Sequence, residues 1–218
     1  MGKKIGVLLS GCGVFDGAEI HEAVITLLAL DREGAKIICM APDVEQVQVV
    51  NHITQKPMDE KRNVLVESAR IARGEIKNLK DVKASHLDAL IMPGGLGAAQ
   101  NLSDFAAKGP DAVVHPEVAR ILKEMLLENK PVGAICIAPA TLVKAVADKK
   151  PEVTIGDDAG TAAALESMGA KHIKRAVDGI CVDKKNKLVT TPAYMLGPGI
   201  KDIALGIEKL VKQVVSMA

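Results

Sequence analysis

Cys136 stands where a short apolar run meets a segment of small residues, a position in which a thiol can act as a nucleophile. Val132 to Ile135 is typical of a buried parallel strand, and Ala138 to Val146 is typical of a helix with Pro139 in its first turn. The N–H groups of a first helical turn have no partners within the helix and carry the positive end of its dipole. We therefore expect them to lower the pKa of Cys136 and to be able to hold an oxyanion. The pattern predicts a nucleophile elbow, and the alternative is a buried cysteine that only packs.

Two glycines follow another predicted strand, because Leu87 to Met92 ends in Pro93-Gly94-Gly95. In open parallel sheets ligands bind at the carboxyl ends of the strands, so this turn and Cys136 are expected to meet at one edge. Gly94 and Gly95 allow the backbone to come close to a ligand or to the nucleophile. The N–H groups of Gly95 and Ile137 would then form a two-donor oxyanion hole.

Glu22 and His21 lie near the start of the first predicted helix, which runs from about Ala18 to Arg32. If Glu22 points under the strand ends it meets Cys136, where a carboxyl can donate a hydrogen bond to a thiolate or accept and return a proton. His21 projects about a quarter turn away and is either the base or a wall of the pocket. Cys136, Glu22 and His21 are therefore the candidate catalytic residues.

The same helix carries further signals. Asp16 is a predicted N-cap, and Glu19 three residues later completes a capping box. Large aliphatic residues share one face of the helix: Ile20, Val24, Leu27 and Leu28.

Other chemistries fit less well. A Cys-His-Asp triad would need a histidine after the cysteine, and only His172 is available there, in a segment with two lysines. Asp157 and Asp158 could line the site, but an N-cap role for one of them fits better than catalysis. The remaining histidines lack metal-ligand spacing, so we expect no metal. Gly11, Gly13 and Gly17 make a dinucleotide-type turn that is one residue too long, with an acidic residue that would repel a pyrophosphate. We therefore expect no cofactor.

Composition limits the class of partner. The 218 residues include 28 basic and 27 acidic ones, interspersed, for a net charge of +1, and the aromatic residues are two phenylalanines and one tyrosine. We expect no nucleic-acid partner, because such proteins need basic patches or stacking aromatics, and no membrane partner, because no apolar stretch is long enough to span one. Lys3 and Lys4 lead into only a short apolar run, so we predict a cytoplasmic protein whose four cysteines are reduced.

The order of the predicted elements indicates an α/β fold with a mostly parallel sheet and right-handed crossovers. We interpret residues 1–218 as one domain with an irregular excursion at about 43–86, where 46–53 suggests a short strand pair and 76–86 a charged surface segment. We predict a further strand at residues 153–155 and a helix at 161–168. A β pair at 180–182 and 187–191 precedes a closing helix at 199–215.

Several motifs together resemble the ThiJ/PfpI superfamily. They are Gly17-Ala18-Glu19-Ile20-His21-Glu22-Ala23-Val24, Pro93-Gly94-Gly95, Gly97-Ala98-Ala99-Gln100-Asn101-Leu102 and Ala134-Ile135-Cys136 with Pro139. Further segments, such as Arg73-Gly74-Glu75-Ile76 and Thr190 to Met195, resemble a bacterial branch of that superfamily linked to isoprenoid biosynthesis. The resemblance implies a flavodoxin-like three-layer sandwich, class I glutamine amidotransferase-like, usually homodimeric.

The resemblance also implies a function. The family cysteine and glutamate map onto Cys136 and Glu22, and the oxyanion donors onto Gly95 and Ile137. Similar proteins are credited with converting glyoxal to glycolate, or methylglyoxal to lactate, without glutathione or any cofactor, and some with protein deglycase activity. Protease-like members have a histidine after the cysteine, where Ile137 stands here, which argues against their triad. The alternative is a redox-sensing or partner-binding role in isoprenoid metabolism, with Cys136 oxidised rather than turning over a dicarbonyl.

Overall fold

A seven-stranded sheet forms the centre of the protein in the computed structural model, which describes residues 2–218. The strand order is β10-β11-β7-β6-β1-β2-β5, and every pairing is parallel except that of β10 with β11. The strands are β1 (Lys4–Leu8), β2 (Lys36–Ala41), β5 (Ile76–Asn78), β6 (Ala89–Met92), β7 (Val132–Ile135), β10 (Cys181–Asp183) and β11 (Leu188–Thr191). The prediction of an α/β fold with a mostly parallel sheet is confirmed.

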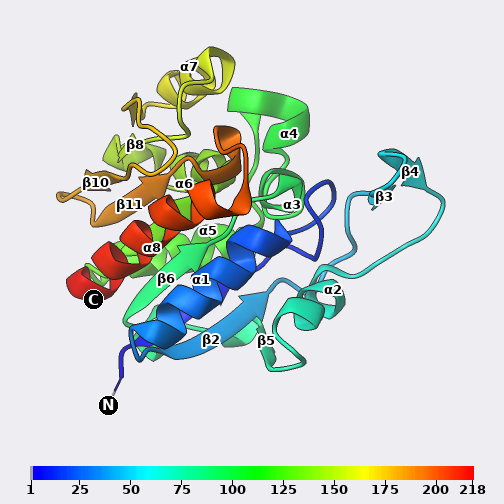
Figure 1. Ribbon diagram of the computed structural model, residues 1–218, viewed down its shortest axis with the longest axis horizontal. Coiled ribbons are helices and arrows are strands. Elements are labelled where there is room, and N and C mark those ends of the chain that lie inside the picture. Colours follow the sequence, from blue (N-terminus) through cyan, green and yellow to red (C-terminus); the bar gives the residue numbers. More distant parts are fainter. Residues whose placement is uncertain (1) are drawn as a thin grey trace.

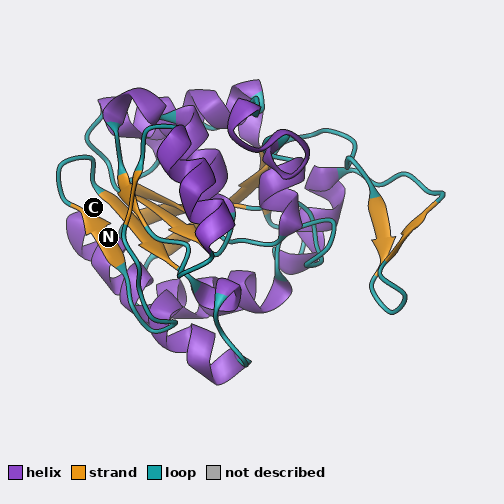
Figure 2. Cartoon of the chain, turned by 90° about the horizontal axis from the view of Figure 1, so that it is seen from above, coloured by secondary structure: helices purple, strands orange, loops and turns teal. Residues whose placement is uncertain are grey.

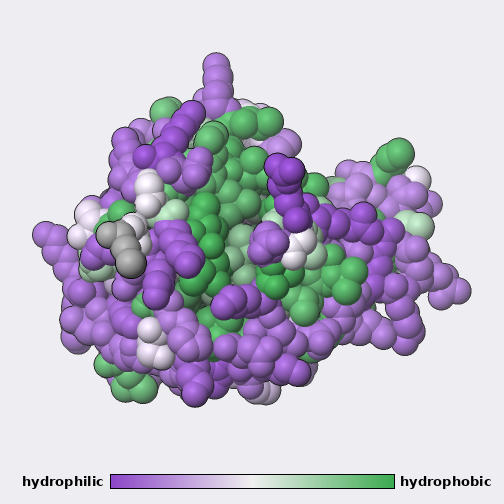
Figure 3. All heavy atoms as spheres, turned by 90° about the horizontal axis from the view of Figure 1, so that it is seen from below, coloured by the Kyte–Doolittle hydropathy of each residue, from purple (hydrophilic) through white to green (hydrophobic). Residues whose placement is uncertain are grey.

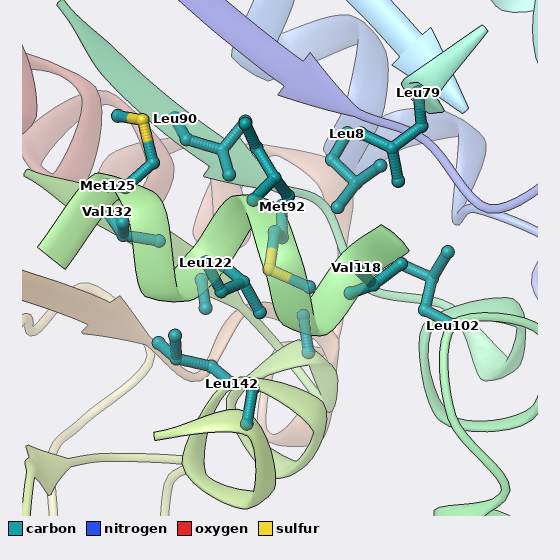
Figure 4. Close-up of a cluster of buried hydrophobic side chains, with 14 of the residues drawn as sticks. Leu8, Leu79, Leu90, Met92, Leu102, Val118, Leu122, Met125, Val132 and Leu142 are labelled. Atoms are coloured by element: carbon teal, nitrogen blue, oxygen red, sulfur yellow. The ribbon is translucent and has the colours of Figure 1, made fainter. Parts of the chain in front are cut away.

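Helices cover both faces of this sheet (Figures 1 and 2). One face is covered by α1 (Ile20–Arg32) and α8 (Ile200–Met217), which lie side by side (Figure 1). The other is covered by α5 (Pro116–Leu127) and α6 (Ala138–Ala145). Because successive strand residues point to opposite faces, Leu90 and Met92 pack against α5 and α6 whereas Ile91 packs on the other side. Figure 4 shows the first of these two cores, which is almost entirely aliphatic.

Smaller elements surround the sandwich. The helices are α2 (Val64–Ile71), α3 (Leu96–Gln100), α4 (Phe105–Lys108) and α7 (Ala159–Ser167), with single turns of 3-10 helix at Leu79–Asp81, Ala84–His86, Gly109–Asp111, Ala147–Lys149 and Ala193–Met195. Two pairs of short strands complete the list: β3 (Val49–Asn51) with β4 (Lys56–Met58), and β8 (Glu152–Val153) with β9 (Lys171–His172). The β3–β4 hairpin projects from the body of the protein, in the excursion expected near 43–86 (Figures 1 and 2).

The strand assignments differ from expectation at two places. Residues 76–86 were predicted to be surface cover only, yet Ile76–Asn78 pairs with Cys39–Ala41 and becomes the edge strand of the sheet. The predicted strand at 153–155 lies outside the main sheet, where Glu152–Val153 pairs with Lys171–His172. Both segments are too short for periodicity to specify their partners.

The N-cap of α1 is Glu19 rather than the predicted Asp16. The Glu19 carboxylate accepts a hydrogen bond from Glu22 N at 2.7 Å. Asp16 is instead buried and accepts a hydrogen bond from Val50 N at 2.8 Å, which ties the base of the excursion to the turn after β1. The helix consequently starts at Ile20, and Glu22 lies in its first turn, where a carboxylate is favoured by the dipole.

A groove of about 600 Å³ lies at the amino-terminal ends of the strands, the end opposite Cys136. It is lined by residues of β1, β2 and β5 and by Ser85 and His86, with Ile37 and Ile38 among the apolar ones. Figure 3 views this lower side, on which an apolar strip lies between hydrophilic residues. Because ligands of open parallel sheets bind at the carboxyl ends, we place the candidate site at the other end.

Candidate active site

Cys136 directly follows β7 and has a strained backbone conformation. Its φ is +60°, a left-handed value that costs a non-glycine residue free energy and occurs often at functional sites. Its backbone N–H donates to the carbonyl oxygen of Thr191 at 2.9 Å, which holds the turn against β11. Ile137 then caps α6, and Pro139 lies in the first turn. The local geometry is the strand–turn–helix of a nucleophile elbow.

Glu22 is completely buried, and its carboxyl lies beside the thiol. Oε2 accepts a hydrogen bond from Gly94 N at 2.9 Å, and Oε1 accepts one from Tyr194 N at 3.2 Å. The carboxyl lies near enough to the Cys136 side chain for each group to shift the pKa of the other. The two backbone hydrogen bonds hold the carboxyl in position and orientation.

Gly94 makes this approach possible. A Cβ at position 94 would lie 2.5 Å from Cys136 Cβ and 2.6 Å from Glu22 Oε2. No side chain fits in that space, so position 94 requires glycine.

Burial raises the pKa of Glu22 to about 8, and the nearby charge of Glu19 adds to the rise. The hydrogen bonds from Tyr194, Cys136 and Gly94 oppose the shift without cancelling it. Below that pKa the carboxyl is protonated and uncharged, and above it the carboxylate can accept the proton of the thiol. Its pKa is therefore suited to exchanging a proton near neutral pH.

Burial also raises the pKa of Cys136, and the charge of an ionised Glu22 raises it further. The backbone N–H groups of Gly95 and Ile137, hydrogen-bonded to the sulfur, oppose the rise. Our expectation of a lowered pKa was therefore wrong for the free protein, because only 8% of Cys136 remains exposed and burial outweighs the helix terminus. A raised pKa favours the protonated thiol over the thiolate in the free protein.

Gly95 and Ile137 approach the thiol from two elements, the turn after β6 and the start of α6, and the N–H group of each acts to lower the pKa of Cys136. Gly95 has a φ of +91°, and a Cβ there would lie 2.4 Å from both Glu19 N and Gly17 O. Position 95 is consequently also restricted to glycine.

His21 lies apart from the sulfur, at the rim. Its side chain is 48% exposed, and its Nδ1 is 2.8 Å from the hydroxyl of Tyr194. The structure thus brings together Cys136, Glu22, Gly94, Gly95 and Ile137, and leaves His21 as a neighbour of the group. Tyr194 contributes its backbone N–H, a donor that no sequence pattern identifies because every residue except proline has one.

The residues of the alternative sites lie in structural roles. His172 Nε2 is 3.4 Å from Ile155 N, beside β8, and the carboxylate of Asp158 caps α7 by accepting from Thr161 N at 2.7 Å. The glycine-rich turn is packed against neighbouring backbone, since a Cβ at Gly17 would lie 2.2 Å from Cys12 N. Within residues 2–218, histidine, cysteine and acidic side chains form no group of three that could hold a metal ion. No helix in that range is long and apolar enough to cross a bilayer.

Comparisons with known proteins agree with this architecture. The model of the DJ-1/PfpI family matches residues 12–195, so the chain belongs to the DJ-1/PfpI family, the ThiJ/PfpI, class I glutamine amidotransferase-like proteins. A rat protein named "ES1 protein homolog, mitochondrial" is 47% identical over 224 aligned residues, which cover 98% of this chain and 84% of the rat protein. Its printed name places the rat protein in mitochondria and states no activity, so the cytoplasmic location of this chain stays a prediction.

Solved structures agree with the fold. An isoprenoid biosynthesis protein with an amidotransferase-like domain from Ehrlichia chaffeensis superposes with a TM-score of 0.93 at 36% identity, covering 99% of both chains. Glyoxalase III from Candida albicans superposes with a TM-score of 0.64 at 15% identity, covering 97% of both chains, and shows a shared fold alone. The predicted flavodoxin-like three-layer sandwich is confirmed.

Proposed function

We propose that this protein is a glyoxalase that converts glyoxal to glycolate, or methylglyoxal to lactate, without glutathione, metal or cofactor. The observation that carries the proposal is the close approach of the buried Glu22 carboxyl to Cys136, which leaves room only for a glycine at position 94 between them. The N–H groups of Gly95 and Ile137 act on the pKa of the same thiol. A nucleophile, a proton acceptor and two oxyanion donors are thereby gathered around one reacting atom.

The first step forms a carbon–sulfur bond. The Glu22 carboxylate takes the thiol proton as the sulfur attacks one aldehyde carbon, and the carbonyl oxygen becomes an oxyanion held by Gly95 N and Ile137 N. Protonation of that oxygen by Glu22 gives a hemithioacetal and returns Glu22 to its carboxylate form. The sulfur needs no resting negative charge, which agrees with the raised pKa of Cys136.

The second step moves one proton between the two carbons. Glu22 removes the proton from the hemithioacetal carbon while the neighbouring carbonyl oxygen takes up a proton, which gives an enediol. A proton then adds to the other carbon as the hydroxyl on the sulfur-bearing carbon loses its proton, which yields the thioester of glycolic acid. One carbon of the dicarbonyl is oxidised and the other reduced, so no external electron carrier is needed. Water then cleaves the thioester and regenerates the thiol.

The fold shared with glyoxalase III of Candida albicans supports this proposal only at the level of the scaffold. The chemical support comes from Glu22, which is buried enough to hold a pKa of about 8 and therefore accepts and returns protons near neutral pH. Protein deglycation would use the same hemithioacetal chemistry on a larger substrate.

The test is glycolate formation from glyoxal in the absence of glutathione and metal ions, by the wild type, Cys136→Ala and Glu22→Gln. We expect turnover by the wild type and at least about a 1,000-fold loss in both variants, because each removes a group that acts on the reacting atoms. Cys181→Ala is the matched control, since that cysteine is buried in β10 and has no carboxyl hydrogen-bonded to it. Wild-type rates in Cys136→Ala would end the proposal.

A further inference from the structure

The groove of about 600 Å³ at the amino-terminal ends of the strands has no part in the reaction proposed above. It exists because β5 starts late. The ladder between β2 and β1 begins at Lys36, whereas the ladder between β2 and β5 begins only at Cys39. Residues 36–38 therefore have a neighbouring strand on one side alone, and the space on their other side is open. Its volume lies in the range of sites that bind small molecules.

Three lysines lie around this groove on one face of the sheet. Lys4 is directly opposite Lys36 in the register of β1 and β2, and Lys77 of β5 is opposite Met40 of β2. Because alternate residues of a strand share a face, all three lysines project from the face that also carries Ile38. All three line the groove together with Ile38, so the groove combines cationic groups with apolar surface.

The three lysine charges are not neutralised within residues 2–218, where none of them forms an ion pair. Glu75 is the one carboxylate among the lining residues, so three ammonium groups share the groove with one negative charge. Asp88 is near Lys4, and its carboxylate accepts a hydrogen bond from the backbone N of Lys4 at 2.7 Å. Like charges that lie opposite each other on neighbouring strands repel, and a bound anion would offset the repulsion between Lys4 and Lys36.

We infer that this groove binds an organic anion with an apolar chain, the chemistry shared by fatty carboxylates and alkyl phosphates. The anionic head would lie between Lys4 and Lys36, which the strand register places side by side. The apolar chain would lie along Ile37 and Ile38, at the open edge of β2. The inference concerns binding at the end of the sheet opposite Cys136 and does not depend on the reaction proposed above.

Both parts of the ligand are needed to match the groove. An inorganic anion would leave the isoleucine side chains in water, and an uncharged chain would leave the lysine charges unpaired. His86 also lines the groove, and its Nδ1 accepts a hydrogen bond from Lys83 N at 3.3 Å. The hydrogen of the neutral ring is therefore on Nε2, which makes His86 a further donor for a carboxylate or phosphate oxygen.

The test is isothermal titration calorimetry of the wild type with decanoate and with decyl phosphate. We expect at least one of them to bind with a dissociation constant at or below about 1 mM, as is usual for ligands of this size. The tighter of the two identifies the preferred head group. Octanoate should bind at least about 3-fold more weakly than decanoate, because it buries two fewer CH₂ groups. Inorganic phosphate should bind at least about 5-fold more weakly than decyl phosphate, and octanol more weakly than octanoate.

A charge variant tests the role of the lysines. The double variant Lys4→Gln/Lys36→Gln should raise the dissociation constant about 5- to 20-fold, because it removes both cations from the head group. Lys56→Gln is the matched control, since Lys56 is an exposed lysine of a strand, β4, and lies outside the groove. It should bind the ligand as the wild type does. Circular dichroism shows whether each variant is folded.

Amide NMR spectra show where the ligand binds. The ligand should shift the amide signals of Ile37 and Ile38 and leave those of Gly95 and Ile137 unchanged, which separates the groove from the oxyanion donors of the active site. Shifts at Gly95 and Ile137 without shifts at Ile37 and Ile38 would overturn the inference. So would a folded double variant that binds as tightly as the wild type, or a wild type that binds neither ligand at about 2 mM.

Discussion

The Oε1 atom of Glu22 accepts a hydrogen bond from the backbone N–H of Tyr194 at 3.2 Å, although 172 residues separate the two in sequence. Gly94 N donates a hydrogen bond to the other oxygen, Oε2. With both oxygens bound by backbone donors, Cys136 is the main group with which the carboxyl can exchange its proton. A glutamine at this position would have to turn its NH₂ group toward one of the two N–H donors. The site is therefore specific for a carboxyl, because only a carboxyl offers an acceptor on both sides and a titratable proton.

Activity should follow the ionisation of Glu22. Because burial raises the pKa of Glu22 to about 8, kcat/KM should rise with pH and level off above that value, as the carboxylate form becomes available to take the thiol proton. The measurement is the initial rate of glycolate formation over a range of pH at low glyoxal concentration. A profile that is flat between about pH 6 and pH 9 would contradict the assignment of Glu22 as base.

The free energy of unfolding should fall as pH rises, whereas kcat/KM should increase. A raised carboxyl pKa means that the folded protein keeps a proton that the unfolded chain loses, so the contribution of Glu22 is complete below about pH 4.5 and is lost as pH rises through about 8. The free energy of unfolding of the wild type should fall over that range relative to Glu22→Gln. The variant also carries a constant cost of about 1–3 kcal/mol for the N–H donor it leaves unpaired.

Urea unfolding of both proteins at several pH values gives this difference directly. The constant cost shifts the two curves apart without tilting them, so the slope of the difference reports Glu22 alone. Parallel curves for the wild type and Glu22→Gln would show that the pKa of Glu22 is not raised.

Gly94→Ala should disable the site. The added Cβ would lie 2.5 Å from Cys136 Cβ, so the turn after β6 must move away and carry the Gly94 and Gly95 N–H groups with it. We expect at least about a 100-fold loss of kcat, as on losing an oxyanion donor, and a destabilisation of about 1–3 kcal/mol.

Gly160→Ala is the control for this prediction, because Gly160 lies within α7 and a Cβ there would be 3.7 Å from the nearest atom, Asp158 Oδ1. It should leave turnover unchanged and the stability equal or slightly higher. Full activity in Gly94→Ala would mean that the tight contact of Gly94 with Cys136 and Glu22 is not needed for catalysis.

His21→Ala should have a much smaller effect than Glu22→Gln. His21 is bonded to the rim hydroxyl of Tyr194 and is half exposed, so we expect less than about a 10-fold loss of kcat/KM, well below the effect of removing a general base. Steady-state kinetics of His21→Ala and Tyr194→Phe, which break the same contact from its two sides, should agree. A loss in His21→Ala as large as that in Glu22→Gln would transfer the role of base to His21.

The sequence predicted the parts of the site that depend on residue type and position in an element. The apolar run before Cys136 and the small residues after it define the elbow, and the Pro93-Gly94-Gly95 turn ends the neighbouring strand. Because parallel strands share one carboxyl edge, these two segments had to meet. The first-turn position of Glu22 followed from the start of the helix in the same way.

Other features depend on tertiary contacts that no local pattern encodes. The Tyr194 N–H donates to Glu22 from a turn in which Ala193 adopts a φ of +43°. An alanine in the sequence does not predict a left-handed φ. The direction of the Cys136 pKa shift depends on burial by the surrounding elements, which here outweighs the favourable helix terminus. The spacing of the aliphatic residues did not predict which face of α1 is buried, because the buried face holds Glu22 and mostly small residues.

The most direct test of the account is the mass of the peptide that contains Cys136, after the protein reacts with glyoxal and is rapidly quenched with acid. The hemithioacetal and the thioester are isomers, so both add the mass of one glyoxal molecule to this peptide. We predict this adduct at Cys136 during wild-type turnover, and its absence from the peptides that contain Cys12, Cys39 and Cys181. Glycolate formation by a wild-type protein that never carries the adduct at Cys136 would contradict the claim that this thiol is the nucleophile.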